Sequence, residues 1–174
     1  MDLKSHIRNI KDFPKEGIMF RDITTLLKNP ETLNYTLEQL LNFIDGKKIT
    51  KVVGIESRGF IFGSLLAHKL NCGFIPVRKP GKLPAEKVSI AYSLEYGEDK
   101  LEMHKDAIQP GDKILVHDDL LATGGTMNAV CQLIEQLGGE IVQVSFIVEL
   151  SFLNGRAKLK SYDVRSIVDY TNED

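Results

Sequence analysis

The sequence predicts a single α/β domain, residues 1–174, in which a mostly parallel, twisted sheet is flanked by helices. Short apolar runs of strand length alternate with longer helical stretches, which is the pattern of strand–helix–strand units. One middle segment instead alternates with period 2, which predicts an antiparallel hairpin inserted into the parallel unit. The 174 residues, 43% hydrophobic and 26% charged, match an ordinary globular composition and are enough for one packed core.

The first half of the chain carries the signals of one strand–helix–strand unit. Asn29 and Pro30 predict a helix cap and first turn, after which leucines recur on one helical stripe until Gly46. The unit itself is expected in three segments: strand 51–55 (KVVGI), helix 60–70 and strand 73–79 (GFIPVRK). Residues 1–25 precede this unit, so we expect them to form a small hood over the strand ends.

The inserted hairpin is predicted from KVSIAYSLEYG and the residues after it. Val88, Ile90 and Tyr92 alternate with small or polar residues, and Leu101 and Met103 alternate on the return. We expect the turn at residues 97–99, Gly-Glu-Asp, because this composition is typical of turns.

The second half continues the alternation of strands and helices. The segment IVQVSFIV is almost entirely apolar, which predicts a central strand buried on both faces. The expected elements are strand 113–117, helix 125–137, strand 140–148, a short helix near 155–160 and strand 164–168.

Charge and composition argue against several classes of protein. The net charge of -2 and the pI near 6.1 give no overall attraction to nucleic acid or to an anionic membrane. The N-terminal segment lacks the apolar core of a secretory signal, and no apolar run approaches the roughly 20 residues of a membrane span. Cys72 and Cys131 are isolated, so we expect two reduced thiols in a cytoplasmic protein.

Chemistry-bearing residues follow three of the predicted strands, and ligands of parallel sheets bind beyond these carboxyl ends. The clearest segment is LVHDDLLATGGTMNAV, in which two aspartates end an apolar run and a Gly/Thr-rich turn opens a helix. Glycines permit a tight backbone cradle, and the helix presents its positive end, so the turn predicts a phosphate site. The residues of this site are Ala122, Thr123, Gly124, Gly125 and Thr126.

Asp118 and Asp119 complete the predicted binding site. Ionised carboxylates only accept hydrogen bonds, and the vicinal hydroxyls of ribose are matched donors. The segment therefore predicts a ribose-5-phosphate site. It contains neither the lysine of a nucleoside-triphosphate loop nor the GxGxxG of a dinucleotide site.

The string VHDDLLATGGT resembles the phosphoribosyl pyrophosphate (PRPP) signature of type I phosphoribosyltransferases. Within that superfamily, further segments are similar to the adenine phosphoribosyltransferases in order and spacing: DFPKEGIMFRDITTLL, ESRGFIFG, VRKPGKLP, YSLEYG and VELSFLNGR. His117 and Thr25 depart from residues common in the family, without removing a functional side chain. The resemblance implies a type I phosphoribosyltransferase fold and transfer of 5-phosphoribose from PRPP to N9 of adenine, giving AMP and pyrophosphate in purine salvage.

The resemblance also assigns roles outside the ribose-5-phosphate segment. Pyrophosphate is assigned to Arg58, Arg78 and Lys82, and the basic window 78–87 favours a shaped anion-binding loop over a merely solvated face. Mg²⁺ is expected as the cofactor, held by ligand oxygens and water and not by a protein cage. A homodimer is implied as well.

The adenine pocket and the catalytic group are assigned in the same way. Phe20 would stack on the purine and Leu150 would cover its other face, with backbone groups at Met19 and Arg21 contacting the exocyclic amine. Glu95 lies beside Tyr96 on a segment similar to the family's mobile lid. We expect Glu95 to move the N9 proton or to orient the base, with Arg58 as the second catalytic residue.

Two alternatives remain open from the sequence. One is a non-catalytic regulator that senses PRPP and binds nucleic acid, which the pI and the short N-terminal stretch disfavour. The other is an enzyme for hypoxanthine, guanine or xanthine. Such a site must satisfy a 6-oxo group, and no basic side chain stands out for that purpose.

Overall fold

The computed structural model describes residues 1–94 and 97–173 and is built around one five-stranded parallel sheet. The strand order is β4-β3-β7-β8-β9, and all neighbouring pairs run parallel. The strands are β3 (Lys51–Ile55), β4 (Gly73–Val77), β7 (Lys113–Leu121), β8 (Glu140–Leu150) and β9 (Val164–Tyr170). The predicted parallel sheet is therefore confirmed.

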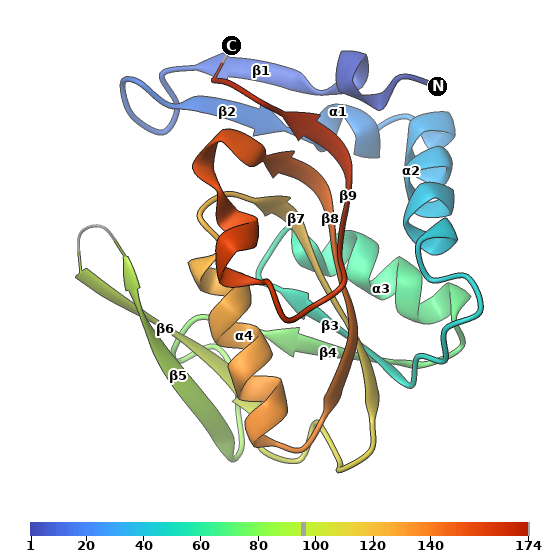
Figure 1. The fold of residues 1–174 in the computed structure, drawn as a ribbon, viewed down its shortest axis with the longest axis vertical. Helices are drawn as coiled ribbons and strands as arrows, with labels where there is room; N and C mark the ends of the chain where they lie inside the picture. The colour runs from blue at the N-terminus through green and yellow to red at the C-terminus, as the bar shows by residue number, and fades with distance from the viewer. Residues whose placement is uncertain (95–96, 174) are drawn as a thin grey trace.

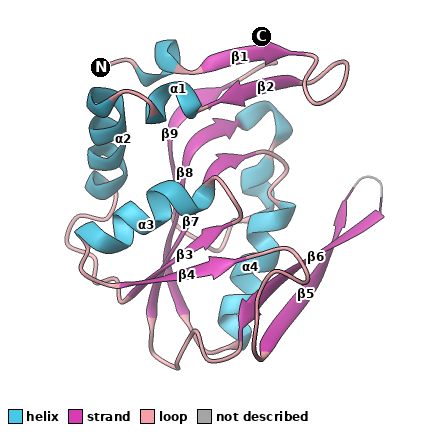
Figure 2. Ribbon diagram, turned by 180° about the vertical axis from the view of Figure 1, so that it is seen from behind, coloured by secondary structure: helices cyan, strands magenta, loops and turns pink. Residues whose placement is uncertain are grey.

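Each face of the sheet buries a separate apolar cluster beneath the elements that cover it, and Figures 1 and 2 show how these elements are arranged. Helices α2 (Pro30–Asn42) and α3 (Gly59–Lys69) cover one face, with α1 (Thr24–Leu27) beside them. Helix α4 (Gly125–Gln136) and the antiparallel pair β5 (Lys87–Leu94) and β6 (Gly97–His104) cover the other. Alternate strand residues supply the two clusters, for example Val52 to the first and Val53 to the second.

The N-terminal hood is an antiparallel pair, β1 (Arg8–Lys11) and β2 (Met19–Asp22), which follows the short 3₁₀ helix η1 (Leu3–His6). The hood lies over the carboxyl ends of β7, β8 and β9 (Figure 1). After β8 the chain forms two more 3₁₀ helices, η2 (Ser151–Leu153) and η3 (Gly155–Lys158), before it enters β9. Together with the inserted β5–β6 hairpin, this arrangement confirms the predicted fold class.

Local signals explain most element boundaries. The Asn29 side chain accepts a hydrogen bond from the Glu31 N–H and caps α2, which begins at Pro30. Leu37 and Leu40 are buried on the predicted stripe, but the helix ends at Asn42, before the left-handed Gly46. Strand β8 is interior, as predicted, although β7 occupies the middle of the sheet.

Some boundaries differ from the sequence prediction. The turn expected at residues 97–99 is wrong, because these residues begin β6 and pair with residues 92–94 of β5. Strand β7 runs four residues beyond the predicted end and includes both aspartates. The segment after Gly155 forms a 3₁₀ turn that ends at Lys158. None of the described helices has the length and apolar character needed to cross a membrane.

Candidate active site

Three cavities adjoin one another at the carboxyl ends of the strands, under the hood. Their volumes are about 90 Å³ at the start of α4, about 280 Å³ between β3, β7 and the hairpin, and about 470 Å³ beneath the hood. Leu120 lines all three, and Arg58 lines the second and third. We call them the loop cavity, the central cavity and the hood cavity.

The loop cavity is formed by the turn between β7 and α4. Gly124 has a φ of 79°, in the left-handed region that favours glycine, and α4 begins at the next residue. The cavity is lined by residues 120–127 together with Asp118 and Phe146. Backbone N–H groups at the first turn of a helix attract an anion, so this geometry suits a phosphate group.

The loop is held in place by very close backbone packing against η3. A Cβ on Gly124 would lie 2.4 Å from the carbonyl oxygen of Gly155, and a Cβ on Gly155 would lie 2.2 Å from that of Ala122. The next residue, Arg156, donates two hydrogen bonds of 2.6 and 2.7 Å to the nearly buried carboxylate of Glu149. This bidentate pair fixes η3 to the end of β8, and η3 in turn supports the phosphate loop.

The two aspartates line the central cavity from strand β7. A Cβ on Gly59 would lie 2.9 Å from Oδ1 of Asp118, so only glycine lets α3 begin so close to this strand. Nε of Arg58 lies 2.8 Å from Oδ2 of Asp119, but its N–H is not directed at that oxygen. Among the described residues, no donor forms a hydrogen bond with this buried oxygen.

Burial raises the pKa of both carboxyl groups. The pKa of Asp118 lies well above its usual value because the carboxyl is desolvated and because Asp119 is adjacent. The pKa of Asp119 is also raised by burial, although the charge of Arg58 opposes the shift. Two desolvated carboxylates next to each other are expensive to ionise, so the pair favours a ligand that donates hydrogen bonds.

The basic loop after β4 is gathered around Glu56. Nε of Arg78 lies 3.3 Å from Oε2 of Glu56, the Lys79 N–H donates to the same oxygen at 2.8 Å, and the Lys82 ammonium pairs with Oε1. Burial alone would raise the pKa of Glu56, but these contacts lower it. Glu56 lines the central cavity, so it holds Arg78 and Lys82 at its edge.

The residues that line the hood cavity are more apolar than those that line the other two cavities. Phe20 of β2 is half-buried and forms an edge contact with Phe13, at 5.0 Å between ring centroids. The guanidinium carbon of Arg58 lies 4.8 Å from the Phe20 ring centroid. Met19, Phe20, Leu150, Phe152 and Leu153 supply apolar wall, which suits a flat aromatic ligand.

The C-terminal segment closes one side of the hood cavity. Arg21 is buried, with its guanidinium carbon 3.9 Å from the Tyr170 ring centroid, and it donates a hydrogen bond of 2.7 Å to the Glu173 carbonyl oxygen. Glu173 also lines the cavity. The wall therefore combines the hood with residues from the opposite end of the chain.

Comparisons with known proteins point to one family. The family model of the phosphoribosyl transferase domain matches residues 22–172. A curated relative from Flavobacterium johnsoniae, named adenine phosphoribosyltransferase, is 59% identical over 170 residues, which cover 98% of this chain and 100% of the relative. The chain belongs to the adenine phosphoribosyltransferase family.

Solved structures of the adenine phosphoribosyltransferase family share the fold throughout. The crystal structure of the protein from Thermoanaerobacter pseudethanolicus is 50% identical, with a TM-score of 0.95 over 97% of this chain and 98% of that one. The protein from Giardia lamblia, solved in complex with 9-deazaadenine, is 36% identical, with a TM-score of 0.92 over 98% and 97% of the two chains.

Most residues that the sequence assigned by analogy with adenine phosphoribosyltransferases lie at the three cavities. The loop residues 122–126 line the loop cavity, Asp118, Asp119 and Arg58 line the central cavity, and Met19, Phe20, Arg21 and Leu150 line the hood cavity. Arg78 and Lys82 lie beside the central cavity, where both form ion pairs with Glu56. Glu95 and Tyr96 lie outside the described residues, so their predicted roles stay predictions.

Several residues at the cavities were not predicted. Lys79, Tyr92 and Asp99 line the central cavity, and Phe152 and Glu173 line the hood cavity. Lys79 belongs to the basic window that the sequence does show. His117 lies away from the cavities: it is fully buried, its Nδ1 is 3.0 Å from the Ser145 hydroxyl, and burial lowers its pKa to about 3.

Proposed function

We propose that this protein transfers 5-phosphoribose from PRPP to N9 of adenine, releasing pyrophosphate and forming AMP. The observation that carries this proposal is the buried Oδ2 of Asp119, an acceptor without a hydrogen bond, on the cavity next to a phosphate-binding loop. The charge of Arg58 offsets part of the cost of burying this oxygen, and a ligand that donates a hydrogen bond would offset the rest. A ribose diol supplies two donors, and its 5′-phosphate reaches the loop.

The phosphoribosyl group would be held at both ends. Residues 122–126 bind the 5′-phosphate through backbone N–H groups and threonine hydroxyls, while Asp118 and Asp119 accept the ribose hydroxyls. Binding at two points orients C1′ toward the hood cavity, where the base lies. Orientation of this kind removes much of the entropic barrier between two reactants.

The leaving pyrophosphate would face the central cavity. Arg58 and Lys79 line this cavity, and Arg78 and Lys82 can exchange the carboxylate of Glu56 for phosphoryl oxygens. Cations around the leaving oxygen stabilise the charge that develops as the C1′–O bond breaks. The N9–C1′ bond forms, and N9 gives up its proton, which we assign to the predicted group Glu95.

Adenine would occupy the hood cavity between Phe20 and Leu150, which the sequence assigned to its two faces. The Giardia lamblia relative was solved with 9-deazaadenine, a close adenine analogue, which supports an adenine site in this family. Backbone groups of the hood strand then contact the base edge. Arg58 lies against Phe20 and Asp119 together, so it links the base to the ribose.

Mg²⁺ is part of the same proposal. Among the residues that the structure describes, no group of three His, Cys, Asp or Glu side chains could hold a metal ion. The acidic edge of the central cavity, Asp118 and Asp119, nevertheless fits an ion carried mainly by PRPP oxygens and water. Bound there, Mg²⁺ would neutralise charge on the pyrophosphate. Removal of Mg²⁺ with a chelator should abolish turnover.

The remaining expectations rest on the family resemblance. We propose that the protein is a homodimer and that it acts in the cytoplasm, where its two cysteines stay free thiols. Sedimentation of the purified protein at several concentrations tests the dimer: a single monomer mass at all of them contradicts it.

Initial rates with four bases test the proposed reaction. With PRPP and Mg²⁺, we expect AMP and pyrophosphate from adenine, and far slower reaction with hypoxanthine, guanine and xanthine. The variant Asp119→Asn should lose most of the activity, whereas Asp106→Asn, at an exposed position, should keep it. If no base is consumed, the proposal is wrong; if a 6-oxopurine reacts faster than adenine, the assigned base is wrong.

A further inference from the structure

A chain of polar contacts connects the phosphate loop to the inserted hairpin. The hydroxyl of Thr126 donates to the hydroxyl of Tyr92 at 3.4 Å, and Tyr92 donates to Oδ2 of Asp99 at 3.2 Å. Tyr92 and Asp99 face each other across β5 and β6 as cross-strand partners. The contacts therefore attach both strands of the hairpin to the start of α4.

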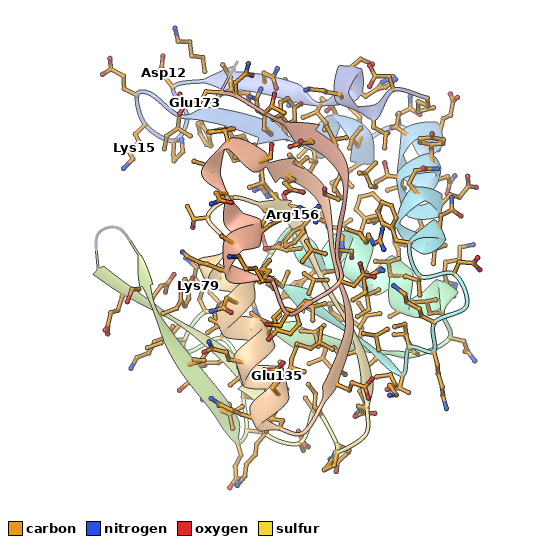
Figure 3. The ribbon with its side chains drawn as sticks, viewed as in Figure 1. Asp12, Lys15, Lys79, Glu135, Arg156 and Glu173 are labelled. Carbon is orange, nitrogen blue, oxygen red and sulfur yellow. The ribbon has the colours of Figure 1, made fainter. Side chains whose placement is uncertain are left out.

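The chain continues to the basic loop on the other side of the central cavity. Nζ of Lys79 lies 3.6 Å from Oδ2 of Asp99. The central cavity is lined by all four residues of this chain of contacts, Thr126, Tyr92, Asp99 and Lys79. The last of them is labelled in Figure 3. The hairpin is thus attached on one side to a residue assigned to the 5′-phosphate and on the other to Lys79, which lines the cavity proposed for pyrophosphate.

These contacts compete with the substrate. The Thr126 hydroxyl carries one proton, and a phosphate dianion is a stronger acceptor than a phenol oxygen. When the loop binds a 5′-phosphate, Thr126 donates to it, and Tyr92 loses its donor. Burial and the nearby charges of Asp99 and Asp118 raise the pKa of Tyr92, so it remains a protonated donor to Asp99.

We propose that Tyr92 is a positioning residue of this site, whose hydroxyl holds the hairpin against the phosphate loop until the 5′-phosphate takes over the Thr126 hydroxyl. The inference rests on the proposed function. Glu95, the predicted catalytic group, follows Tyr92 by three residues on the same segment. The contacts of Tyr92 therefore fix the position of the hairpin relative to the phosphate loop before PRPP binds.

The variant Tyr92→Phe separates positioning from direct phosphate binding. It removes one hydroxyl and keeps the ring, so we expect kcat to fall about tenfold, the effect of losing one hydrogen bond to a charged group. The KM for PRPP should stay unchanged or decrease, because Thr126 no longer has a competing acceptor. A raised KM with normal kcat, or no change in either, would overturn the proposal.

Tyr162→Phe is the matched control. The Tyr162 hydroxyl also donates to a carboxylate, that of Glu135 in α4, at 3.0 Å. Glu135 lies at the opposite end of the helix from the phosphate loop (Figure 3). We expect this variant to keep both kcat and KM. An equal loss of kcat in both variants would show that only general stability matters, which also overturns the proposal.

A spectroscopic readout tests the exchange directly. The chain has five tyrosines and no tryptophan, so its near-ultraviolet absorption reports mainly on tyrosine. Titration with ribose 5-phosphate should change this absorption in the wild-type protein and in Tyr162→Phe, but not in Tyr92→Phe. If ribose 5-phosphate binds without any spectral change in the wild type, the Tyr92 proposal fails. If it does not bind, the proposed function fails instead.

Discussion

Apart from Phe146, the wall of the loop cavity comes from a single short segment, Asp118 and residues 120–127, whereas the hood cavity draws on segments from the whole length of the chain. The hood cavity is lined by residues 17–21, Arg58, three residues of the segment 120–123, three of the segment 150–153, and Glu173. The first region is fixed by backbone conformation and close backbone contacts. The second depends on how the side chains of separate elements pack together.

The comparison suggests different sensitivities for the two regions. A backbone cradle tolerates almost no added atom, because the neighbouring carbonyl groups cannot move independently. An apolar slot made from several side chains can adjust around a changed residue, at a smaller cost. Substitutions that add or remove a few atoms should therefore affect PRPP binding more than adenine binding.

Gly155→Ala should have the largest effect. The added Cβ would lie 2.2 Å from the Ala122 carbonyl oxygen, so the phosphate loop or η3 must shift. We expect a loss of roughly 1–3 kcal/mol in unfolding free energy, and a steep rise in the KM for PRPP. Gly73→Ala is the control, because its nearest neighbour, a Lys51 side-chain carbon, lies at an ordinary 3.7 Å. Normal PRPP kinetics in Gly155→Ala would refute the supporting role of η3.

Asp118→Asn should reduce activity and increase stability. The loss of a charged acceptor should lower kcat/KM roughly 10- to 150-fold, equivalent to about 1.5–3 kcal/mol. The raised pKa of Asp118 means that its stability contribution is present below the unfolded pKa and is lost as pH rises through the folded pKa. Above the unfolded pKa, the cost of burying this carboxyl group therefore lowers the stability of the fold, and asparagine removes that cost.

Thermal unfolding at several pH values measures this effect. The melting temperature of Asp118→Asn should exceed that of the wild type at neutral pH, and the difference should shrink toward acidic pH. Asp106→Asn, at an exposed position, serves as the control. A lower melting temperature for Asp118→Asn at neutral pH would contradict the pKa argument.

Phe20→Ala tests the hood cavity. Removing an aromatic ring that stacks on a base costs about 1–3 kcal/mol in other nucleic-acid sites, and the apolar slot can partly collapse here. We therefore expect the KM for adenine to rise about tenfold, near the lower end of that range. The KM for PRPP should stay within about twofold, since Phe20 lines only the hood cavity. Equal rises in both constants would show that the two regions are not separable.

The same contrast explains how much of the fold could be predicted. Strand β3 and helix α4 were placed to within one residue, because strand length, apolar periodicity and Gly-rich ends are local signals. The hairpin turn was misplaced because Gly97 and Asp99 favour turns by composition. Instead Gly97, Glu98 and Asp99 pair with residues 92–94 of β5, and this pairing overrides that preference.

At the site, the continuous segment could be predicted and the assembled contacts could not. The loop and the aspartates lie within nine residues of each other, so their chemistry is visible in the sequence. The approach of Gly155 to Ala122, the contact of Arg58 with Asp119 and the position of Glu173 depend on packing between distant elements. No local pattern encodes such distances. The sequence does place Arg58 just past a strand end, but only the family resemblance assigned it to pyrophosphate.

His117→Val should have the smallest effect on catalysis, although His117 precedes Asp118 in the chain. Its side chain lies on the α3 face of the sheet, with its ring centroid 6.5 Å from that of Phe62, and it lines none of the three cavities. We therefore expect normal kcat/KM for both substrates. The measurable change is in the pH dependence of stability.

Burial lowers the pKa of His117 to about 3, against a usual value of 6.5, with only partial opposition from the contact to Ser145. The neutral ring favours the folded state above pH 6.5, and stability is lost as pH falls from 6.5 toward 3, by about 1.4 kcal/mol per pH unit. The double variant His117→Val, Ser145→Ala should lose this dependence without leaving a buried hydroxyl unpaired. Unchanged acid sensitivity of its melting temperature would mean that other groups, and not His117, set the acid limit of the fold.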